Sequence, residues 1–326
     1  MMSEAVLITG GAGFIGSHLV ERLAETGHRV VCLDNFDPYY PAAVKRANLQ
    51  QALSSERVRL VEADVRDRGA LGSVLAGEKL GAIVHLAARA GVRPSLQDPE
   101  LYLDVNVRGT LNLLEAAREF GVPRVVFASS SSVYGRTEGM ANEEKTPCRP
   151  LSPYGASKVA GEALCSAYAE TGGPSVVALR LFTVYGPRQR PDMAINRFTR
   201  LIASGQEIDV HGDGYSLRDY TFISDIVDGI EAALQVSLPG YAVFNLGRGQ
   251  PAVLLDVIRL IEKCLATRAR LRFLPEQPGD PPLTHADVGK AAAFLNYRPS
   301  VSIEEGIAHY VRWYRQSGEV LSALAG

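Results

Sequence analysis

The chain has 326 residues, of which 46% are hydrophobic and 21% are charged, and its formal net charge is −2. This length suffices for a large domain and a smaller one, and the balance of residue types is ordinary for a globular enzyme. A net charge so close to zero argues against a general nucleic-acid binder, which needs an excess of basic residues.

The first predicted element is a short buried strand, Ala5–Ile8, which runs into the glycine-rich turn Thr9–Gly16 and then into a helical pattern. Strand, glycine turn and helix form the context that a dinucleotide fingerprint requires. The glycines let the backbone approach a pyrophosphate, which N–H groups at the helix N-terminus then hold. A tight structural turn is the alternative. The expected cofactor-binding residues here are Gly10, Gly13, Phe14, Ile15 and Gly16.

The second predicted strand, Arg29–Leu33, ends in Asp34, 18 residues after Gly16. An acidic residue at this place accepts hydrogen bonds from a ribose diol and repels a 2′-phosphate, so it favours NAD over NADP. We therefore predict NAD as the cofactor and place Asp34 and the adjacent Asn35 among its binding residues.

Helical and hydrophobic stretches then continue to alternate along the chain. The predicted elements are a helix over Ala42–Leu53, strands over Val58–Glu62 and Ala82–Leu86, a helix over Leu103–Phe120, a strand over Arg124–Ala128, a helix beginning near Tyr154 and a strand over Ser175–Leu181. This alternation predicts a doubly wound parallel sheet of the Rossmann type, an α/β fold.

The composition shifts after Gly186-Pro187, where arginines cluster and short helices alternate with proline-rich loops. We predict an NAD-binding domain over residues 1–186 with a returning segment near 217–250. A smaller α/β substrate domain is expected to comprise most of residues 187–326.

Ligands of such sheets lie outside the carboxyl ends of the strands, so residues at several strand ends should share one crevice. Ala87 and Ala88 are small enough to let a cofactor pass close by. Asp64 and Val65 suit the adenine edge, although a helix cap is an equally good interpretation of that spacing. The further expected cofactor-binding residues are Asp64, Val65, Leu86, Ala87, Ala88, Asn106, Ser129, Tyr154 and Lys158.

Ser152-Pro153 predicts a helix start, because serine is a good N-cap and proline suits the first helical position. Tyr154 and Lys158 then lie one turn apart on one face, where the ammonium would stabilise a phenolate and allow base catalysis near neutral pH. An ordinary solvated pair is the alternative. Ser130 can share a proton network with Tyr154, so the predicted catalytic residues are Tyr154, Lys158 and Ser130.

The four cysteines (Cys32, Cys148, Cys165 and Cys264) show no spacing typical of a metal site, so we expect free thiols and no metal. No apolar run approaches the roughly 18 residues of a membrane span, and the N-terminus does not resemble a signal peptide. We therefore expect a cytoplasmic protein without membrane or nucleic-acid partners.

As a set, these motifs resemble the extended short-chain dehydrogenase/reductases, in the NAD-dependent epimerase/dehydratase family. The matching stretches are Thr9–Gly16, Asp64-Val65, His85–Ala88, the serine run into Val133–Gly135, Tyr154–Lys158, Arg180–Pro187 and Arg218–Tyr220. The resemblance implies a nucleotide-sugar substrate, bound NAD and a homodimer formed through two helices of the first domain.

Branches of this family differ at the serine run. Nucleotide-sugar 4,6-dehydratases carry Thr-Asp-Glu there and UDP-glucuronate decarboxylases keep a glutamate, whereas this chain has Ser130–Ser132 without a carboxylate. UDP-galactose/glucose 4-epimerases usually have asparagine where Thr183 stands. Stretches that resemble UDP-glucuronate 4-epimerases in particular are Asp34–Tyr40, Ala90–Arg93, Phe182–Tyr185, Arg190–Ala194 and Gln277–Asp280.

The resemblance thus implies C4 epimerisation of a UDP-sugar, most closely UDP-glucuronate to UDP-galacturonate, through a transient 4-keto intermediate. Alternatives are a UDP-glucose/UDP-galactose 4-epimerase, a UDP-glucuronate decarboxylase, a net reductase and a non-catalytic NAD-sensing protein. A reductase would need exchangeable NADPH, which Asp34 disfavours. A sensor has no need of the three predicted catalytic residues together.

The candidate substrate-binding residues are Arg93, Ser130, Ser131, Ser132, Thr183, Arg190, His211, Arg218 and Asp280. The hydroxyls of Ser130–Ser132 and Thr183, with the guanidinium of Arg190, could bind a sugar carboxylate by charge-assisted hydrogen bonds. The fork of an arginine also suits a diphosphate, so Arg190 and the other two arginines are equally candidates for the UDP diphosphate. Asp280 could take the uridine ribose, and His211 could pack near the base or be an ordinary loop histidine.

Overall fold

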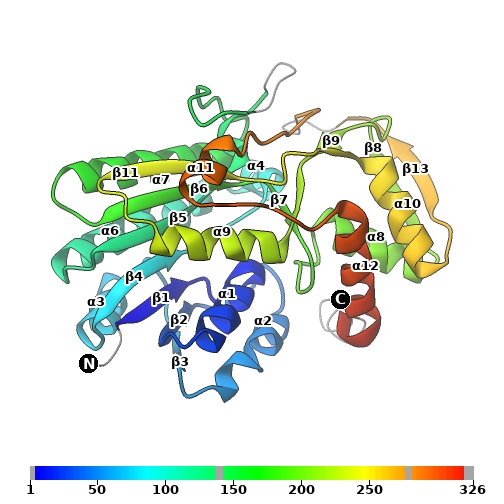
Figure 1. Ribbon diagram of the computed structural model, residues 1–326. Helices are drawn as coiled ribbons and strands as arrows, with labels where there is room; N and C mark the ends of the chain where they lie inside the picture. Colours follow the sequence, from blue (N-terminus) through cyan, green and yellow to red (C-terminus); the bar gives the residue numbers. More distant parts are fainter. Residues whose placement is uncertain (1–3, 137–141, 277–280, 319–326) are drawn as a thin grey trace.

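Seven hydrophobic strands form a parallel sheet at the centre of the larger part of the molecule (Figure 1). The computed structural model describes residues 4–136, 142–276 and 281–318. In order across the sheet, the strands are β11 (Tyr241–Leu246), β6 (Ser175–Leu181), β5 (Arg124–Ser130), β4 (Leu80–His85), β1 (Ala5–Thr9), β2 (Val30–Asp34) and β3 (Val58–Glu62). The strand order reverses at β1, which lies between β2 and β4. Its carboxyl end is therefore the switch point at which such sheets bind ligands.

Helices cover both faces of the sheet, because successive side chains of a strand point to opposite sides. In β1, Leu7 packs into the core beneath α3, α6 and α7, whereas Ile8 packs into the core beneath α1 and α9. The helices of this part are α1 (Phe14–Glu25), α2 (Ala42–Leu49), α3 (Arg68–Ala76), α4 (Val92–Gln97), α5 (Pro99–Leu103), α6 (Gly109–Glu119), α7 (Pro153–Glu170) and α9 (Ile223–Gln235), with short helical turns at η1 (Ala52–Ser54) and η3 (Ser131–Val133). Burial on both faces explains why the strands are almost continuously apolar.

The second, smaller part gathers at the right of Figure 1 around three amphipathic helices. These are α8 (Ala194–Ala203), α10 (Leu254–Leu265) and α12 (Ile303–Trp313), the last followed by the π turn η4 (Tyr314–Gly318). Three two-stranded sheets complete it: β7 (Thr183–Tyr185) with β10 (Tyr220–Phe222), β9 (Leu217–Arg218) with β12 (Ala252–Val253), and β8 (Glu207–His211) with β13 (Arg270–Leu274). The short helix α11 (Gly289–Phe294) lies against β11.

Residues 223–246 return to the first part, since α9 packs beside α1 and β11 pairs with β6. Two predicted helices differ from the observed ones. The helix expected over Ala42–Leu53 ends at Leu49, and the one expected over Leu103–Phe120 contains a π turn, η2 (Asp104–Arg108), between α5 and α6. A π turn accommodates an extra residue, which helical periodicity in the sequence does not reveal. Within the described residues, no helix has both the length and the apolar character that crossing a membrane requires.

Candidate active site

The carboxyl ends of the central strands open onto a cavity of about 370 Å³. The sequence-predicted residues that line it are Gly10, Gly13, Phe14, Ile15, Gly16, Asp34, Asn35, Asp64, Val65, Leu86, Ala87, Ala88, Ser129, Ser130, Ser131, Ser132, Tyr154, Lys158, Thr183 and Arg190. They meet because parallel strands all end at the same edge of the sheet. Four predicted site residues, Arg93, Asn106, His211 and Arg218, are not in this lining, and Asp280 lies outside the described residues.

In the glycine turn, backbone segments approach each other so closely that a residue with a Cβ would not fit. Gly10 has a φ of +71°, and a Cβ there would lie 2.7 Å from the backbone nitrogen of Ala87. A Cβ on Gly16, in the first turn of α1, would lie 2.2 Å from the carbonyl oxygen of Gly10. Gly13 caps α1 without a side chain, so the helix N-terminus presents bare N–H groups to the cavity. Such an end suits the pyrophosphate of a dinucleotide.

Asp34 is fixed at the end of β2 by two backbone donors. Its carboxylate accepts from the N–H of Ala12 (3.0 Å) and of Phe36 (2.8 Å), and the ammonium of Lys45 lies 4.0 Å away. Beside them, the hydroxyl of Tyr40 is buried and has no hydrogen-bond partner among the described residues. An unsatisfied buried hydroxyl is costly, and a bound cofactor could satisfy it. These groups and the glycine turn fit a dinucleotide.

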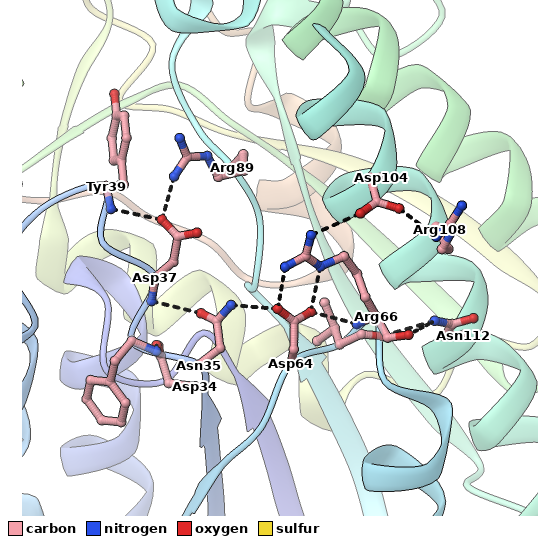
Figure 2. A network of polar contacts seen from close by, with 12 residues as sticks. Asp34, Asn35, Asp37, Tyr39, Asp64, Arg66, Arg89, Asp104, Arg108 and Asn112 are labelled. Atoms are coloured by element: carbon pink, nitrogen blue, oxygen red, sulfur yellow. Dashed lines mark hydrogen bonds and ion pairs between the residues drawn. The ribbon is translucent and has the colours of Figure 1, made fainter. Parts of the chain in front are cut away.

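A polar network holds the loops at this end of the cavity (Figure 2). Asn35 accepts from the N–H of Asp37 (3.0 Å) and donates to Asp64 (2.8 Å). Arg66 pairs with Asp64 (2.8 Å) and with Asp104 of the π turn (2.9 Å). Hydrogen bonds to Asp64, chiefly from the Arg66 side chain, lower its pKa to about 2. Asp64 therefore stays ionised and rigid where the cofactor ribose and adenine are expected.

The helix-cap interpretation of Asp64 is wrong. The residue that caps α3 is Asp67, which accepts from the N–H of Ala70 at 3.0 Å. Asp64 lies on the cavity wall instead. Sequence spacing could not separate the two carboxylates, because they are three residues apart and both follow β3.

Asn106, predicted as a cofactor contact, holds two cavity-lining segments together. Its side chain accepts from the backbone N–H of Arg89 (2.8 Å) and donates to the Arg89 carbonyl (3.0 Å) and to Ser157 (2.9 Å). Ser157 in turn donates to the carbonyl of Tyr154 (2.7 Å). Asn106 thus fixes the loop after β4 against the start of α7.

Tyr154 lies in the first turn of α7, where Ser152 caps the helix by accepting from the N–H of Gly155 (3.1 Å). The Ser130 side chain interacts with the phenol of Tyr154, and its hydroxyl oxygen also accepts from the N–H of Ser132 (3.1 Å). Burial raises the pKa of Tyr154, whereas the Ser130 hydrogen bond and the Arg190 charge lower it. Tyr154 and Ser130 thus lie together on the cavity wall, and their catalytic roles stay predictions.

Lys158 lies one turn further along α7 and is buried. Its ammonium donates to the carbonyl of Ala128 at the end of β5 (2.7 Å). Burial lowers the pKa of Lys158 to about 8, and the neighbouring Cys165 and Glu162 raise it. The charge of Arg190 lowers the pKa of Tyr154. That the Lys158 ammonium favours the phenolate stays a prediction.

Arg190 lines the cavity on the side of the second part of the molecule. It forms two hydrogen bonds with Asp192, both 2.9 Å, and its guanidinium lies 5.6 Å from the centre of the Tyr39 ring. Tyr39 also donates to Asp192 (3.2 Å) and lies 4.7 Å from the guanidinium of Arg89. Sequence reasoning assigned no role to Tyr39, Tyr40, Lys45 or Arg89, although all four line the cavity. Only the stretch Asp34–Tyr40, singled out by family resemblance, pointed toward the two tyrosines.

Three predicted substrate residues belong to other surroundings. Arg93 is exposed on α4, His211 lies at the end of β8 with its Nδ1 3.3 Å from the Pro275 carbonyl, and Arg218 donates to the carbonyls of Leu217 (3.0 Å) and Pro282 (3.2 Å). Their assignment to the UDP moiety stays a prediction. Among the residues that the structure describes, no group of three or more histidine, cysteine or acidic side chains could hold a metal ion.

Comparison with known proteins gives a consistent picture. Residues 6–247 match the model of the NAD dependent epimerase/dehydratase family. The chain is 38% identical over 319 residues to a UDP-glucuronate 4-epimerase of Thermodesulfobacterium geofontis, with 98% of each chain covered.

Solved structures of similar sequence identity also match the chain. A UDP-glucuronic acid 4-epimerase from Bacillus cereus, in complex with UDP-glucuronic acid and NAD, superposes with a TM-score of 0.91 at 38% identity, covering 96% of this chain and 99% of the other. A UDP-glucose 4-epimerase from Thermus thermophilus, in complex with NAD, gives a TM-score of 0.88 at 35% identity with the same coverage.

Proposed function

The chain belongs to the NAD-dependent epimerase/dehydratase family, and we propose that it interconverts UDP-glucuronate and UDP-galacturonate by inverting C4 of the sugar. The predictions of an NAD-dependent nucleotide-sugar epimerase, and of NAD as its cofactor, are confirmed by the family match and these relatives. The observation that carries the choice of sugar is the cavity wall opposite the glycine turn. There Ser130–Ser132, Thr183 and Arg190 line the same cavity as Tyr154 and supply hydroxyls and a cation.

These side chains suit a carboxylated sugar. A guanidinium forms charge-assisted hydrogen bonds to a carboxylate, and hydroxyls can donate to its remaining lone pairs. Asp192 engages Nε and Nη2 of Arg190, so the substrate carboxylate would approach Nη1. The diphosphate is then left to Arg93 and Arg218, outside this cavity.

The reaction combines hydride transfer at bound NAD with proton transfer by residues of the chain. Bound NAD, cradled by the glycine turn and Asp34, supplies reversible hydride acceptance. Tyr154 acts as the base that takes the proton of the C4 hydroxyl, and Ser130 holds the oxygen on which charge develops. Once the 4-keto sugar has turned over in the cavity, Tyr154 returns the proton to the new C4 hydroxyl. No residue of the serine run is a carboxylate, so elimination of the dehydratase type lacks its acid and base.

A 4-keto uronate is a β-keto acid and loses carbon dioxide when its carboxylate bond aligns with the carbonyl π-system. We propose that Ser131, Thr183 and Arg190 hold the carboxylate out of that alignment. Thr183→Val, a change of similar volume, should therefore raise release of the decarboxylated 4-keto pentose several-fold relative to epimerised product. Product ratios from chromatography check this. An unchanged ratio of decarboxylated to epimerised product would show that Thr183 does not hold the carboxylate out of alignment.

The function itself is tested by incubating the enzyme with UDP-glucuronate and with UDP-glucose separately, without added cofactor, and separating the products. We expect UDP-galacturonate from the first, at a kcat/KM at least ten times that for the second. A preference for UDP-glucose would favour the UDP-glucose/UDP-galactose 4-epimerase, the activity of the Thermus relative. No turnover of either would favour the non-catalytic alternative.

Homodimerisation and a cytoplasmic location stay predictions. Family resemblance supports a dimer formed through two helices of the first domain, and light scattering of the purified protein would measure the mass in solution.

A further inference from the structure

A buried ion pair lies one turn beyond Lys158 on the catalytic helix. Glu162 of α7 and Arg180 of β6 are 7% and 5% exposed. Arg180 donates to the two carboxylate oxygens of Glu162 through Nε (2.9 Å) and Nη2 (2.7 Å). Burying two charges costs free energy that such a pair only partly recovers, so its stabilising effect alone is a weak reason for its presence.

The pair is connected to the active site through the end of β5. Ser129, on the cavity wall, donates its hydroxyl proton to the Glu162 carboxylate oxygen that also accepts from Arg180 Nε. Lys158 donates to the carbonyl of Ala128, the residue before Ser129. Lys158 and Glu162, at positions i and i+4 of α7, are thus attached to adjacent residues of one strand.

We propose that Glu162 is a positioning residue for the reaction: its carboxylate keeps Lys158 in the ammonium form at the end of β5, and Arg180 limits the strength of that effect. The inference rests on the proposed function only where it requires the ammonium for turnover. Its electrostatic part concerns Lys158 alone and can be tested without a substrate.

The other groups around Lys158 do not supply opposite charge near neutral pH. The groups around Lys158 are Glu162 and Cys165 from α7, His85 from β4, and the Phe127 ring from β5, 5.1 Å away, with Tyr154 one turn earlier on α7. Burial raises the pKa of Cys165 and of Tyr154, and lowers that of His85 to about 3, so these three groups are neutral near pH 7. Cys165 would raise the pKa of Lys158 only as a thiolate, which its own raised pKa prevents at this pH. The charged groups that remain are Glu162 and, bound to it, Arg180.

Two substitutions of opposite sign separate this electrostatic role from a structural one. Glu162→Gln keeps the shape of the side chain and removes its negative charge, while leaving the positive charge of Arg180. The pKa of Lys158 should then fall by on the order of one unit. Arg180→Gln leaves Glu162 unopposed and should raise the pKa of Lys158 by a similar amount. Damage to the fold would not displace this pKa in opposite directions.

The measurement uses the full chain with bound NAD and lysine labelled with ¹³C at Cε, whose chemical shift reports on ammonium ionisation. The chain has only the lysines Lys45, Lys79, Lys145, Lys158, Lys263 and Lys290, so Lys158→Met identifies the resonance by its loss. Cys148→Ala is the matched control, because it removes a contact of Arg180 (Nη2 to Sγ, 3.3 Å) without a change of charge. It should leave the pKa of Lys158 where it is.

The double variant Glu162→Gln/Arg180→Gln guards against a single variant that does not fold. It leaves neither charge of the pair unpaired. Compared with Arg180→Gln, it differs only in the Glu162 charge, so its Lys158 pKa should be the lower of the two. Compared with Glu162→Gln, it should be the higher. Any two of these three variants that fold therefore show whether the pKa of Lys158 shifts in the expected direction.

In the functional arm, the alkaline limb of the kcat profile with UDP-glucuronate should move with the pKa of Lys158 in each variant. Shifts in the same direction, or shifts no larger than that of Cys148→Ala, would overturn the electrostatic role. Displaced pKa values with an unmoved alkaline limb would overturn the positioning role. If the unmodified enzyme turns over no UDP-sugar, the proposed function fails, and the resonance of Lys158 still decides whether Glu162 sets its charge.

Discussion

Tyr154→Phe is expected to lower kcat for UDP-glucuronate epimerisation by about 10³-fold or more, because general acid–base groups contribute factors of this size. The phenylalanine ring can keep the edge-to-face contact with Tyr102, whose ring centre lies 6.2 Å away. The glycine turn and Asp34 are untouched, so bound NAD should remain. Turnover by chromatography and NAD content after denaturation are the two measurements.

Tyr102→Phe is the matched control, since it removes a hydroxyl from the neighbouring ring, and Tyr102 itself is not among the residues that line the cavity. The Tyr102 hydroxyl donates to the Ala90 carbonyl at 2.9 Å, so its loss should cost about 1 kcal/mol of unfolding free energy and little turnover. Retained turnover in Tyr154→Phe would show that another group removes the C4 proton. Loss of NAD together with turnover would make the substitution uninformative about the base and point to a cofactor-binding role for the phenol.

Gly16→Ala is expected to destabilise the protein by about 3 kcal/mol and to deprive it of NAD, because the new Cβ would lie 2.2 Å from the Gly10 carbonyl oxygen and 2.7 Å from Gly11 Cα. Both are backbone atoms, which cannot rotate away as a flexible side chain could. Relief requires α1 to move from the turn, and with it the N–H groups at its N-terminus. Denaturant unfolding and NAD content of the purified protein measure the two effects.

Gly72→Ala serves as the control for this change. Gly72 also lies within a helix, α3, but the nearest atom to a Cβ there is a ring carbon of Phe120 at 4.0 Å. Alanine should therefore stabilise the helix by about 0.5–1 kcal/mol and leave NAD in place. Equal behaviour of the two variants would contradict the close approach at Gly16.

Much of the fold and part of the site followed from local pattern. Apolar strands alternating with amphipathic helices predicted the parallel sheet, and the rule that ligands lie at carboxyl ends of strands placed Asp34, the serine run and Tyr154 in one crevice. The spacing of Tyr154 and Lys158 carried a functional hypothesis because four residues make one helical turn. Residues whose place in the site depends on their own strand or helix could therefore be predicted from the sequence.

The sequence by itself determined the alternating strands and helices, the glycine turn and the spacing of Tyr154 and Lys158, since each depends on neighbours a few residues away. Only the tertiary structure decided which cation acts on the phenol, which carboxylate faces the cofactor and which buried pair stands behind Lys158. Arg190 is 36 residues from Tyr154, and Tyr39 meets Asp192 across 153 residues of chain. Contacts of that kind depend on how loops dock after the core has formed, and no periodicity along the chain records them.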